Sequence, residues 1–256
     1  MSQVAETIVQ SPARSFLRAR WLYLVMQNYV IDPALLLRHV PAGTELDMWN
    51  GKTFVSMVGF LFQKTSVLGI PALGYRNFEE VNLRFYVRRR APEGWRRGVV
   101  FVKEIVPKRL IAFIARAVYN EAYVALPMRH SLELPTSQKP GLFRYEWATG
   151  KEWNSLEAVV SGEPYLPDQN SEATFITEHY WGYCKQRDGG TVEYQVAHPR
   201  WRVWRAEQSK IICDTAKLYG PEFEAALCQQ PTSAFAAEGS EVMVRRGRRI
   251  AVDYPR

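Results

Sequence analysis

The chain has 256 residues, of which 47% are apolar and 13% aromatic, and its formal net charge at pH 7 is +7. This composition supplies enough apolar surface for a buried core, so it excludes a chain that is disordered throughout. Because all-β domains often reach this length without dividing, we expect a single folded domain over residues 15–245. Residues 1–14 are expected to form a flexible N-terminal segment, and residues 246–256 a basic C-terminal tail or the end of a hairpin.

Cysteine usage and hydropathy narrow the class of protein further. The three cysteines show neither a Cys-x-x-Cys spacing nor a mixed Cys/His ligand pattern, so we expect no disulfide framework and no structural zinc. No apolar run approaches the roughly 20 residues that a membrane span requires, and the N-terminus lacks a secretory signal pattern. We therefore expect a soluble cytoplasmic protein without a membrane partner.

The positive charge is concentrated in two arginine clusters, at residues 88–90 and 245–249. Both fall where short strands are expected to turn, the second at a hairpin tip around Gly247. Arginines at loop tips are mostly solvated, and no nucleic-acid-binding motif accompanies these two clusters. We expect no nucleic-acid partner, and the sequence leaves association of identical chains open.

The first segments of the expected domain have the pattern of strands joined by a short helix. Residues 20–30 are rich in aromatic and β-forming side chains and predict a buried strand. Asp32 followed by Pro33 predicts the N-cap and the first position of a helix over residues 33–40. The Asn50-Gly51 dipeptide then predicts a hairpin turn between two strands.

The rest of the chain alternates between strands and a few helices. Residues 80–87 alternate polar and apolar side chains and predict a strand whose partner follows Gly94. From Pro107 the period changes from two to about 3.6, which predicts a helix over residues 107–121. Further strands are expected at residues 122–134, 142–149, 154–162 and 191–211, and helices at 171–183 and 213–227. The pattern predicts a mainly β (α+β) domain in which helices are inserted into a barrel-like antiparallel sheet.

Common catalytic and cofactor templates are absent from the sequence. No serine lies in a Gly-x-Ser-x-Gly elbow, and no glycine-rich nucleotide loop is present. The four histidines are too scattered to form a metal-binding motif, so we expect neither a metal nor a cofactor. His130 shares a strand face with Met128 and Leu132 and is interpreted as a core residue. His198 shares a face with apolar and aromatic residues and is a candidate for lining a pocket.

The predicted strand over residues 80–87 raises the question of which face is buried. Its alternation places Glu80, Asn82, Arg84 and Tyr86 on one side. If that side faces solvent, the stripe is an ordinary polar surface. If it faces the interior, an acid, an amide, a guanidinium and a phenol gather in one cavity, where they would orient a small ligand.

Lys108 and Arg109 lie in the first turn of the helix predicted from Pro107. The positive end of the helix dipole and the adjacent arginine both disfavour a charged Lys108 amine. An amine that attacks a carbonyl at neutral pH needs its pKa lowered from about 10.4 toward 7, roughly 4 kcal/mol, of which the dipole supplies about 1 at most. Burial must supply the rest. Lys108 is therefore a candidate Schiff-base nucleophile if it lies in the cavity, and an ordinary surface lysine if it is exposed.

Residues 16–60 and the later stretches EVNLRFYVR, YVALPMRH, ITEHYWGY and AHPRW follow one another in a characteristic order. In these segments the chain resembles the YqjF-like family, a group of uncharacterised bacterial proteins related in fold to acetoacetate decarboxylase. The resemblance implies a closed antiparallel β-barrel with an internal cavity. It also implies that Lys108 occupies the slot of the Schiff-base lysine in the decarboxylase motif Pro-Lys-Lys-Leu, with Arg109 in the slot of the second lysine.

Two functions follow as alternatives. In the first, the protein binds a small anionic or carbonyl-bearing molecule inside the barrel. Arg84 and Lys108 then supply the charge, and Glu80, Asn82 and Tyr86 fix the orientation of the ligand. His198 and Tyr180 border it.

In the second alternative the protein is an enzyme, a cofactor-free carbon–carbon lyase or decarboxylase. Lys108 forms an imine with a β-keto acid or a related carbonyl compound, and the fixed charge of Arg109 favours the neutral amine. Glu80 moves protons, while Arg84 holds the substrate carboxylate. Trapping of the imine by borohydride separates the two alternatives.

Overall fold

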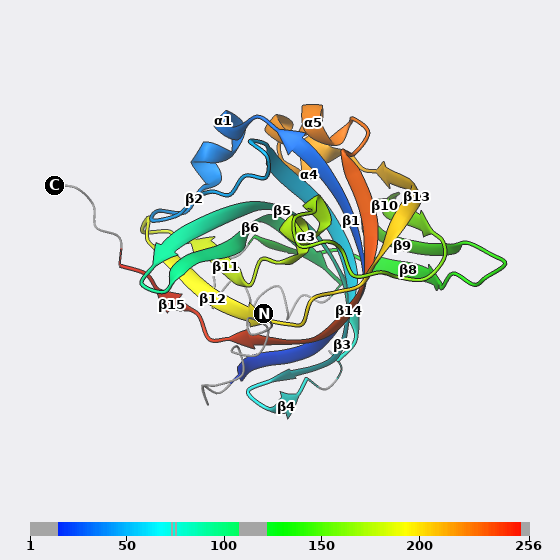
Figure 1. Ribbon diagram of the computed structural model, residues 1–256, viewed down its shortest axis with the longest axis horizontal. Coiled ribbons are helices and arrows are strands. Elements are labelled where there is room, and N and C mark those ends of the chain that lie inside the picture. Colours follow the sequence, from blue (N-terminus) through cyan, green and yellow to red (C-terminus); the bar gives the residue numbers. More distant parts are fainter. Residues whose placement is uncertain (1–14, 73, 75, 108–121, 252–256) are drawn as a thin grey trace.

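The computed structural model describes residues 15–72, 74, 76–107 and 122–251, and most of them form strands (Figure 1). The strands are β1 (Ser15–Ile31), β2 (Glu45–Leu46), β3 (Thr53–Val67), β4 (Ile70–Pro71), β5 (Phe78–Ala91), β6 (Gly94–Val106), β7 (Tyr123–Ala125), β8 (Met128–Glu133), β9 (Gly141–Thr149), β10 (Glu152–Val160), β11 (Trp181–Lys185), β12 (Thr191–Ala197), β13 (Val203–Ile212), β14 (Ser233–Arg245) and β15 (Arg248–Arg249). The helices are α1 (Pro33–Leu36), continued by the 3-10 turn η1 (Leu37–His39), α3 (Glu172–Thr177), α4 (Thr215–Tyr219) and α5 (Pro221–Leu227). The predicted mainly β class with inserted helices is confirmed.

The strand pairings run round in a ring. Hydrogen-bonded neighbours follow the order β12, β11, β6, β5, β3, β1 and β14. Strand β14 then pairs with β12 through Val196–Val244 and Ala197–Met243, which returns the order to its first strand (Figure 1). The ring is antiparallel except for the short contact between β11 and β6. Closure into a barrel stays a prediction.

Strand β5 contains the alternating stretch and lies between β3 and β6 along most of its length. Its apolar side chains, from Val81 to Val87, are buried in one hydrophobic core. Glu80, Asn82 and Arg84 point to the opposite face, because successive side chains of a strand alternate, and they too are buried. Neither face of this strand is therefore an ordinary polar surface.

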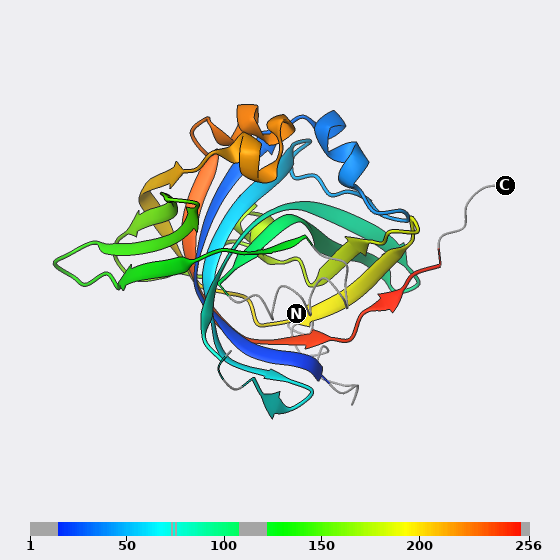
Figure 2. The same cartoon turned by 180° about the vertical axis from the view of Figure 1, so that it is seen from behind.

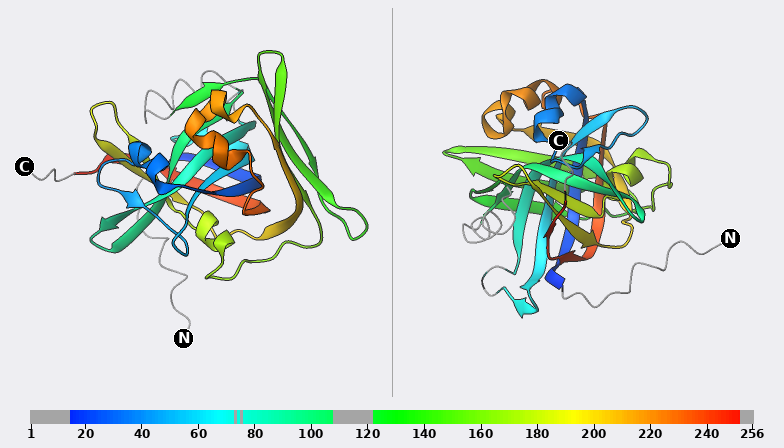
Figure 3. Two further views of the ribbon diagram at one scale, coloured as in Figure 1. Left: turned by 90° about the horizontal axis from the view of Figure 1, so that it is seen from above. Right: turned by 90° about the vertical axis from the view of Figure 1, so that its left-hand side faces the viewer.

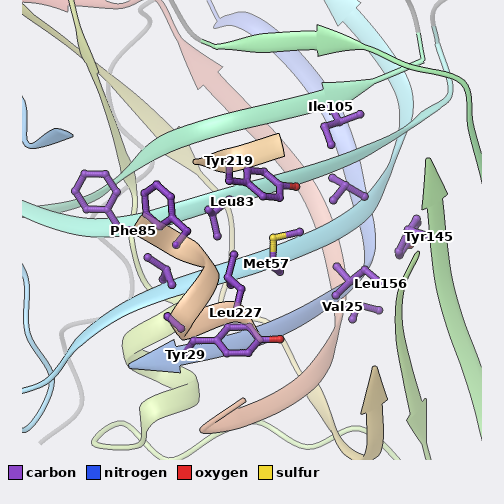
Figure 4. Packing of buried hydrophobic residues seen from close by; sticks show 14 of the residues in the cluster. Val25, Tyr29, Met57, Leu83, Phe85, Ile105, Tyr145, Leu156, Tyr219 and Leu227 are labelled. Atoms are coloured by element: carbon purple, nitrogen blue, oxygen red, sulfur yellow. The ribbon is translucent and has the colours of Figure 1, made fainter. Parts of the chain in front are cut away.

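The larger core lies between the ring and a second layer of the molecule (Figure 4). Met57 and Leu83 come from the ring strands β3 and β5, whereas Tyr145 and Leu156 come from β9 and β10. Tyr219 closes one end from helix α4. Helices α1, α4 and α5 lie together at that end of the molecule, and the β8–β9 hairpin extends to one side (Figures 2 and 3). Full burial of each such side chain contributes roughly 1.5–3 kcal/mol.

The helix cap and the turn that short sequence motifs predicted are both present in the structure. The Asp32 side chain accepts a hydrogen bond from the Ala34 amide at 2.9 Å, which caps α1. Asn50 and Gly51 adopt positive φ values of 50° and 74°, as a tight hairpin turn requires. The hairpin itself is shorter than predicted, because only the Trp49–Lys52 bridge closes it and β2 pairs with β5.

Two expectations are corrected. The helix predicted over residues 171–183 ends at Thr177, because Trp181–Lys185 pairs with β12 and a Cβ on Gly182 would overlap the Tyr194 ring. The predicted basic hairpin end is also wrong. Strand β15 pairs with β12, which lets Arg248 reach the buried Glu193 at 2.8 Å.

The helix predicted over residues 107–121 lies outside the described residues except for Pro107. Among the residues that are described, no helix is long and apolar enough to cross a membrane.

Candidate functional site

A cavity of about 620 Å³ lies within the ring of strands. Its wall is mostly apolar and aromatic, with side chains from β1, β3, β5, β6 and β12. The charged and other strongly polar groups that the described residues contribute to it are Glu80, Asn82, Arg84, Glu104, His179 and His198. This volume is within the usual range of cavities that bury a small organic ligand.

Among the described residues, Arg84 supplies the positive charge on this wall. Its guanidinium has fewer hydrogen-bond acceptors there than it has donors. The residue is only 8% exposed. Its Nη2 donates to the Ile176 carbonyl oxygen at 3.3 Å, and its Nε is buried without an acceptor among the described residues. No carboxylate in the described part of the chain lies within 4 Å of the guanidinium. A buried guanidinium in this state attracts an anion, because burial without a counter-charge is costly.

Two carboxylates lie along the same wall. Glu80 Oε1 accepts a hydrogen bond from Asn82 Nδ2 at 2.9 Å, and Glu80 Oε2 accepts one from the Tyr123 hydroxyl at 3.4 Å. Glu104, on β6, is opposite Asn82 of β5 and opposite Tyr123 of β7. The strand register therefore places Glu104 beside the two residues that donate hydrogen bonds to Glu80. Asn82 and Glu80 are thus two and four residues away from Arg84 along β5.

His198 lines the cavity and keeps one ring nitrogen as a hydrogen-bond acceptor. Its Nδ1 lies 2.8 Å from the Pro199 carbonyl oxygen, which only accepts, so Nδ1 carries the hydrogen and Nε2 keeps its lone pair. The ring is stacked on Trp201 at 4.0 Å and contacts Tyr180 at 4.8 Å between centroids. Burial, opposed by the Pro199 hydrogen bond and assisted by the Arg84 charge, lowers the pKa of His198 to about 4. His198 is therefore neutral at pH 7.

His179 also lines the cavity, and sequence reasoning did not select it as a site residue. Its Nε2 lies 3.1 Å from Asp47 Oδ2, and Arg97 Nε donates to the same oxygen at 2.7 Å. Burial lowers the pKa of His179 to about 4 although the hydrogen bond with Asp47 raises it. Burial alone would raise the pKa of Asp47, but hydrogen bonds from His179 and Arg97 hold it below its usual value.

Only tertiary contacts bring Asp47, Arg97 and His179 together. Asp47 and His179 are 132 residues apart in the chain, and no spacing motif links them. His179 follows an ordinary helix end, so no local signal distinguishes it from a core histidine.

The structure brings four of the predicted site residues to the cavity, namely Glu80, Asn82, Arg84 and His198. Tyr86 and Tyr180 are not among its described lining residues. The Tyr86 hydroxyl lies 2.6 Å from Ser56 Oγ and its ring 4.7 Å from the His179 ring. Tyr180 donates a hydrogen bond to Glu178.

The two remaining predicted residues, Lys108 and Arg109, lie outside the described residues. The interpretation of His130 as a core residue is wrong, because its ring is partly exposed and lies 2.6 Å from Glu79 Oε1. Among the described residues, no group of three or more His, Cys, Asp or Glu side chains is arranged to hold a metal ion.

The family model of DUF2071, described as an uncharacterized conserved protein, matches residues 18–241. The chain belongs to this family. This DUF2071 chain is similar to the uncharacterized protein YqjF of Bacillus subtilis (strain 168), with 26% sequence identity over 199 residues. That alignment covers 75% of this chain and 76% of YqjF.

Solved structures similar to this DUF2071 protein include enzymes. The enduracididine biosynthesis enzyme MppR complexed with pyruvate matches with a TM-score of 0.66 at 12% identity, covering 99% of this chain and 100% of MppR. Acetoacetate decarboxylase from Legionella pneumophila matches with a TM-score of 0.64 at 11% identity, covering 98% of this chain and 92% of the decarboxylase. An acetoacetate decarboxylase-like enzyme from Sphingomonas wittichii RW1 matches with a TM-score of 0.64 at 12% identity, covering 97% of this chain and 100% of that enzyme. At such low identity these similarities show the fold alone.

Proposed function

We propose that this DUF2071 protein binds a small anionic molecule, a carboxylate or a carbonyl-bearing acid, in the cavity within its ring of strands. The observation that carries the proposal is Arg84, a buried guanidinium on the cavity wall with a single protein acceptor among the described residues. The ring then acts as a closed β-barrel around the ligand.

A carboxylate complements Arg84 for two physical reasons. Its charge offsets the cost of burying the guanidinium, and its two oxygens match the guanidinium fork. Both effects are stronger in an apolar cavity than in water. A fold neighbour, MppR, has been solved with pyruvate, which carries a carboxylate beside a carbonyl; this agrees with the proposal at the level of fold.

The neighbouring groups orient the rest of the ligand. In the proposed complex, neutral His198 accepts a hydrogen bond from a ligand hydroxyl through Nε2. Asn82 and Glu80 contact the polar atoms next to the carboxylate. Tyr86 and Tyr180 hold the walls by packing against His179 and His198.

The alternative is a Schiff-base lyase or decarboxylase acting on a β-keto acid. One described feature favours it: β6 carries the cavity residue Glu104 and ends at Val106, two residues before Lys108. In this reaction the Lys108 nitrogen bonds to the carbonyl carbon and water leaves. Loss of carbon dioxide transfers the electron pair of the broken carbon–carbon bond to the protonated imine and gives an enamine. The protonated Glu80 carboxyl donates its proton to the enamine carbon, and water then hydrolyses the imine, which releases the ketone and the Lys108 amine.

Calorimetric titration with a panel of carboxylates and 2-oxo acids tests the binding function. Arg84→Gln is expected to weaken binding roughly 10- to 150-fold, the worth of hydrogen bonds to a charged group. Arg88→Gln is the matched control, because Arg88 is on the same strand but pairs with Glu45 at the surface at 2.7 Å. Equal affinities in the wild type and the Arg84 variant would refute the proposal.

Borohydride trapping tests the alternative. The wild type is mixed with candidate β-keto acids, reduced and weighed as the intact protein. A covalent adduct that is lost in Lys108→Ala establishes the imine, whereas unmodified protein across the panel leaves binding alone.

A further inference from the structure

The part of the cavity away from Arg84 is lined by aromatic and aliphatic side chains. Trp21 lies 5.2 Å from Phe60 and 5.7 Å from Phe62 between ring centroids, and Phe62 stacks on Phe78 at 4.5 Å. All four belong to the cavity wall. Rings of this kind bind apolar groups by burial and by edge or stacking contacts.

The strand register separates this aromatic wall from the guanidinium. Ser56 on β3 is opposite Arg84, Phe60 is opposite Glu80, and Phe62 is opposite Phe78. At about 3.3 Å per residue the aromatic wall therefore begins roughly 13 Å from Arg84 along the strands, at the level of Phe60 and Glu80, and extends to roughly 20 Å. A ligand anchored at Arg84 reaches the aromatic wall only if it carries a long or bulky apolar group.

The cavity reaches the surface at the β3–β4 hairpin, where its wall includes exposed apolar side chains. Leu68 is 65% and Ile70 is 71% exposed. Leu68 has a positive φ of 52° in the turn with Gly69, a conformation that a leucine rarely adopts. This hairpin lies at the end of the molecule opposite α1, α4 and α5 (Figures 1 and 2). Exposed apolar residues at a cavity mouth favour the entry of an apolar ligand over a fully hydrated one.

The volume supports the same conclusion. At about 30 Å³ per water molecule in the liquid, 620 Å³ corresponds to roughly twenty waters. A three-carbon oxo acid has six heavy atoms and would leave most of this space to water against aromatic rings. The apolar wall would then stay in contact with water, and the free energy of removing its surface from water would not contribute to binding.

We propose that the natural ligand is an amphipathic carboxylic acid, with its carboxylate on Arg84 and a long alkyl or aryl group along Trp21, Phe60, Phe62 and Phe78 toward the β3–β4 hairpin. This inference rests on the proposed function and names the ligand class of the same site. It differs from that function in requiring the apolar group for most of the affinity.

A homologous series of straight-chain carboxylates from acetate to dodecanoate, each below its critical micelle concentration, tests the inference by calorimetry. Affinity is expected to rise about fourfold for each added methylene, which corresponds to about 0.8 kcal/mol per buried CH₂. The alcohol of equal length is the matched control without charge. It is expected to bind more weakly than the acid in the wild type and equally with it in Arg84→Gln.

A filling variant separates the ligand class from the anchor. Leu24 lines the cavity on β1 between Leu22 and Val25, which are opposite Leu61 and Gly59 of β3, so it lies near the level of Phe60 and within reach of a chain anchored at Arg84. Leu24→Phe is expected to weaken dodecanoate at least tenfold while leaving acetate and butanoate unchanged, and Lys64→Gln, an exposed change on β3, is expected to alter neither. Affinity independent of chain length but dependent on Arg84 would overturn this inference and leave the proposed function standing. Failure of every carboxylate to bind would overturn both.

Discussion

Replacing Arg84 by methionine is predicted to stabilise the free protein while weakening its binding of carboxylates. The guanidinium is almost fully buried, and its one hydrogen bond among the described residues is to the Ile176 carbonyl. Burying an ion costs several kcal/mol, and a single hydrogen bond from a charged group returns about 1.5–3 kcal/mol. Methionine keeps the apolar stem and removes the charge. The free energy of unfolding is therefore expected to increase by about 1–2 kcal/mol, and Tm by about 2–8 °C.

Urea unfolding and calorimetry, both without ligand, measure this change. Arg97→Met is the control, because Arg97 pairs with the buried Asp47 at 2.7 Å. Its loss is expected to destabilise the protein by about 2–3 kcal/mol, less than for a fully buried pair, since a third of the Arg97 side chain is exposed. If Arg84→Met lowers the free energy of unfolding by more than about 1 kcal/mol, Arg84 is a structural residue and the anion site is refuted.

Two further changes test the packing and the buried histidines. Gly59→Ala is expected to destabilise the protein by about 1–3 kcal/mol in urea unfolding, because the added Cβ would lie 2.8 Å from Tyr145 Cδ2 in the core; a neutral result would mean that the β9–β10 layer packs less tightly against β3. Burial holds the pKa of His179 at about 4, below 6.5 in the unfolded chain. The unfolded chain thus binds more protons between these values, and stability falls by up to about 3 kcal/mol as pH decreases from 6.5 to 4. His179→Asn should flatten this part of the stability curve, and an unchanged slope would contradict the burial of a neutral imidazole.

The sequence determined the features that depend on near neighbours in the chain. The alternation at residues 80–87 predicted β5, since a strand repeats every two residues. Asp32 and the Asn50-Gly51 dipeptide predicted a helix cap and a turn, since each satisfies its geometry within a few residues. The polar stripe also supplied three of the cavity residues, because one buried position on a strand fixes the direction of every second side chain.

Other features depended on tertiary contacts. The sequence predicted a hairpin at the basic C-terminus and a helix through Trp181, but pairing with β12 decided both segments. Asp47 and His179 meet across 132 residues, and no short-range pattern encodes such a contact. The alternating sequence pattern was enough to select Arg84 as a candidate ligand-binding residue. Only the tertiary structure shows that Arg84 is buried and has a single hydrogen-bond acceptor among the described residues. Desolvation and pairing are properties of everything that surrounds a group in space, and for this guanidinium the surroundings come from distant parts of the chain.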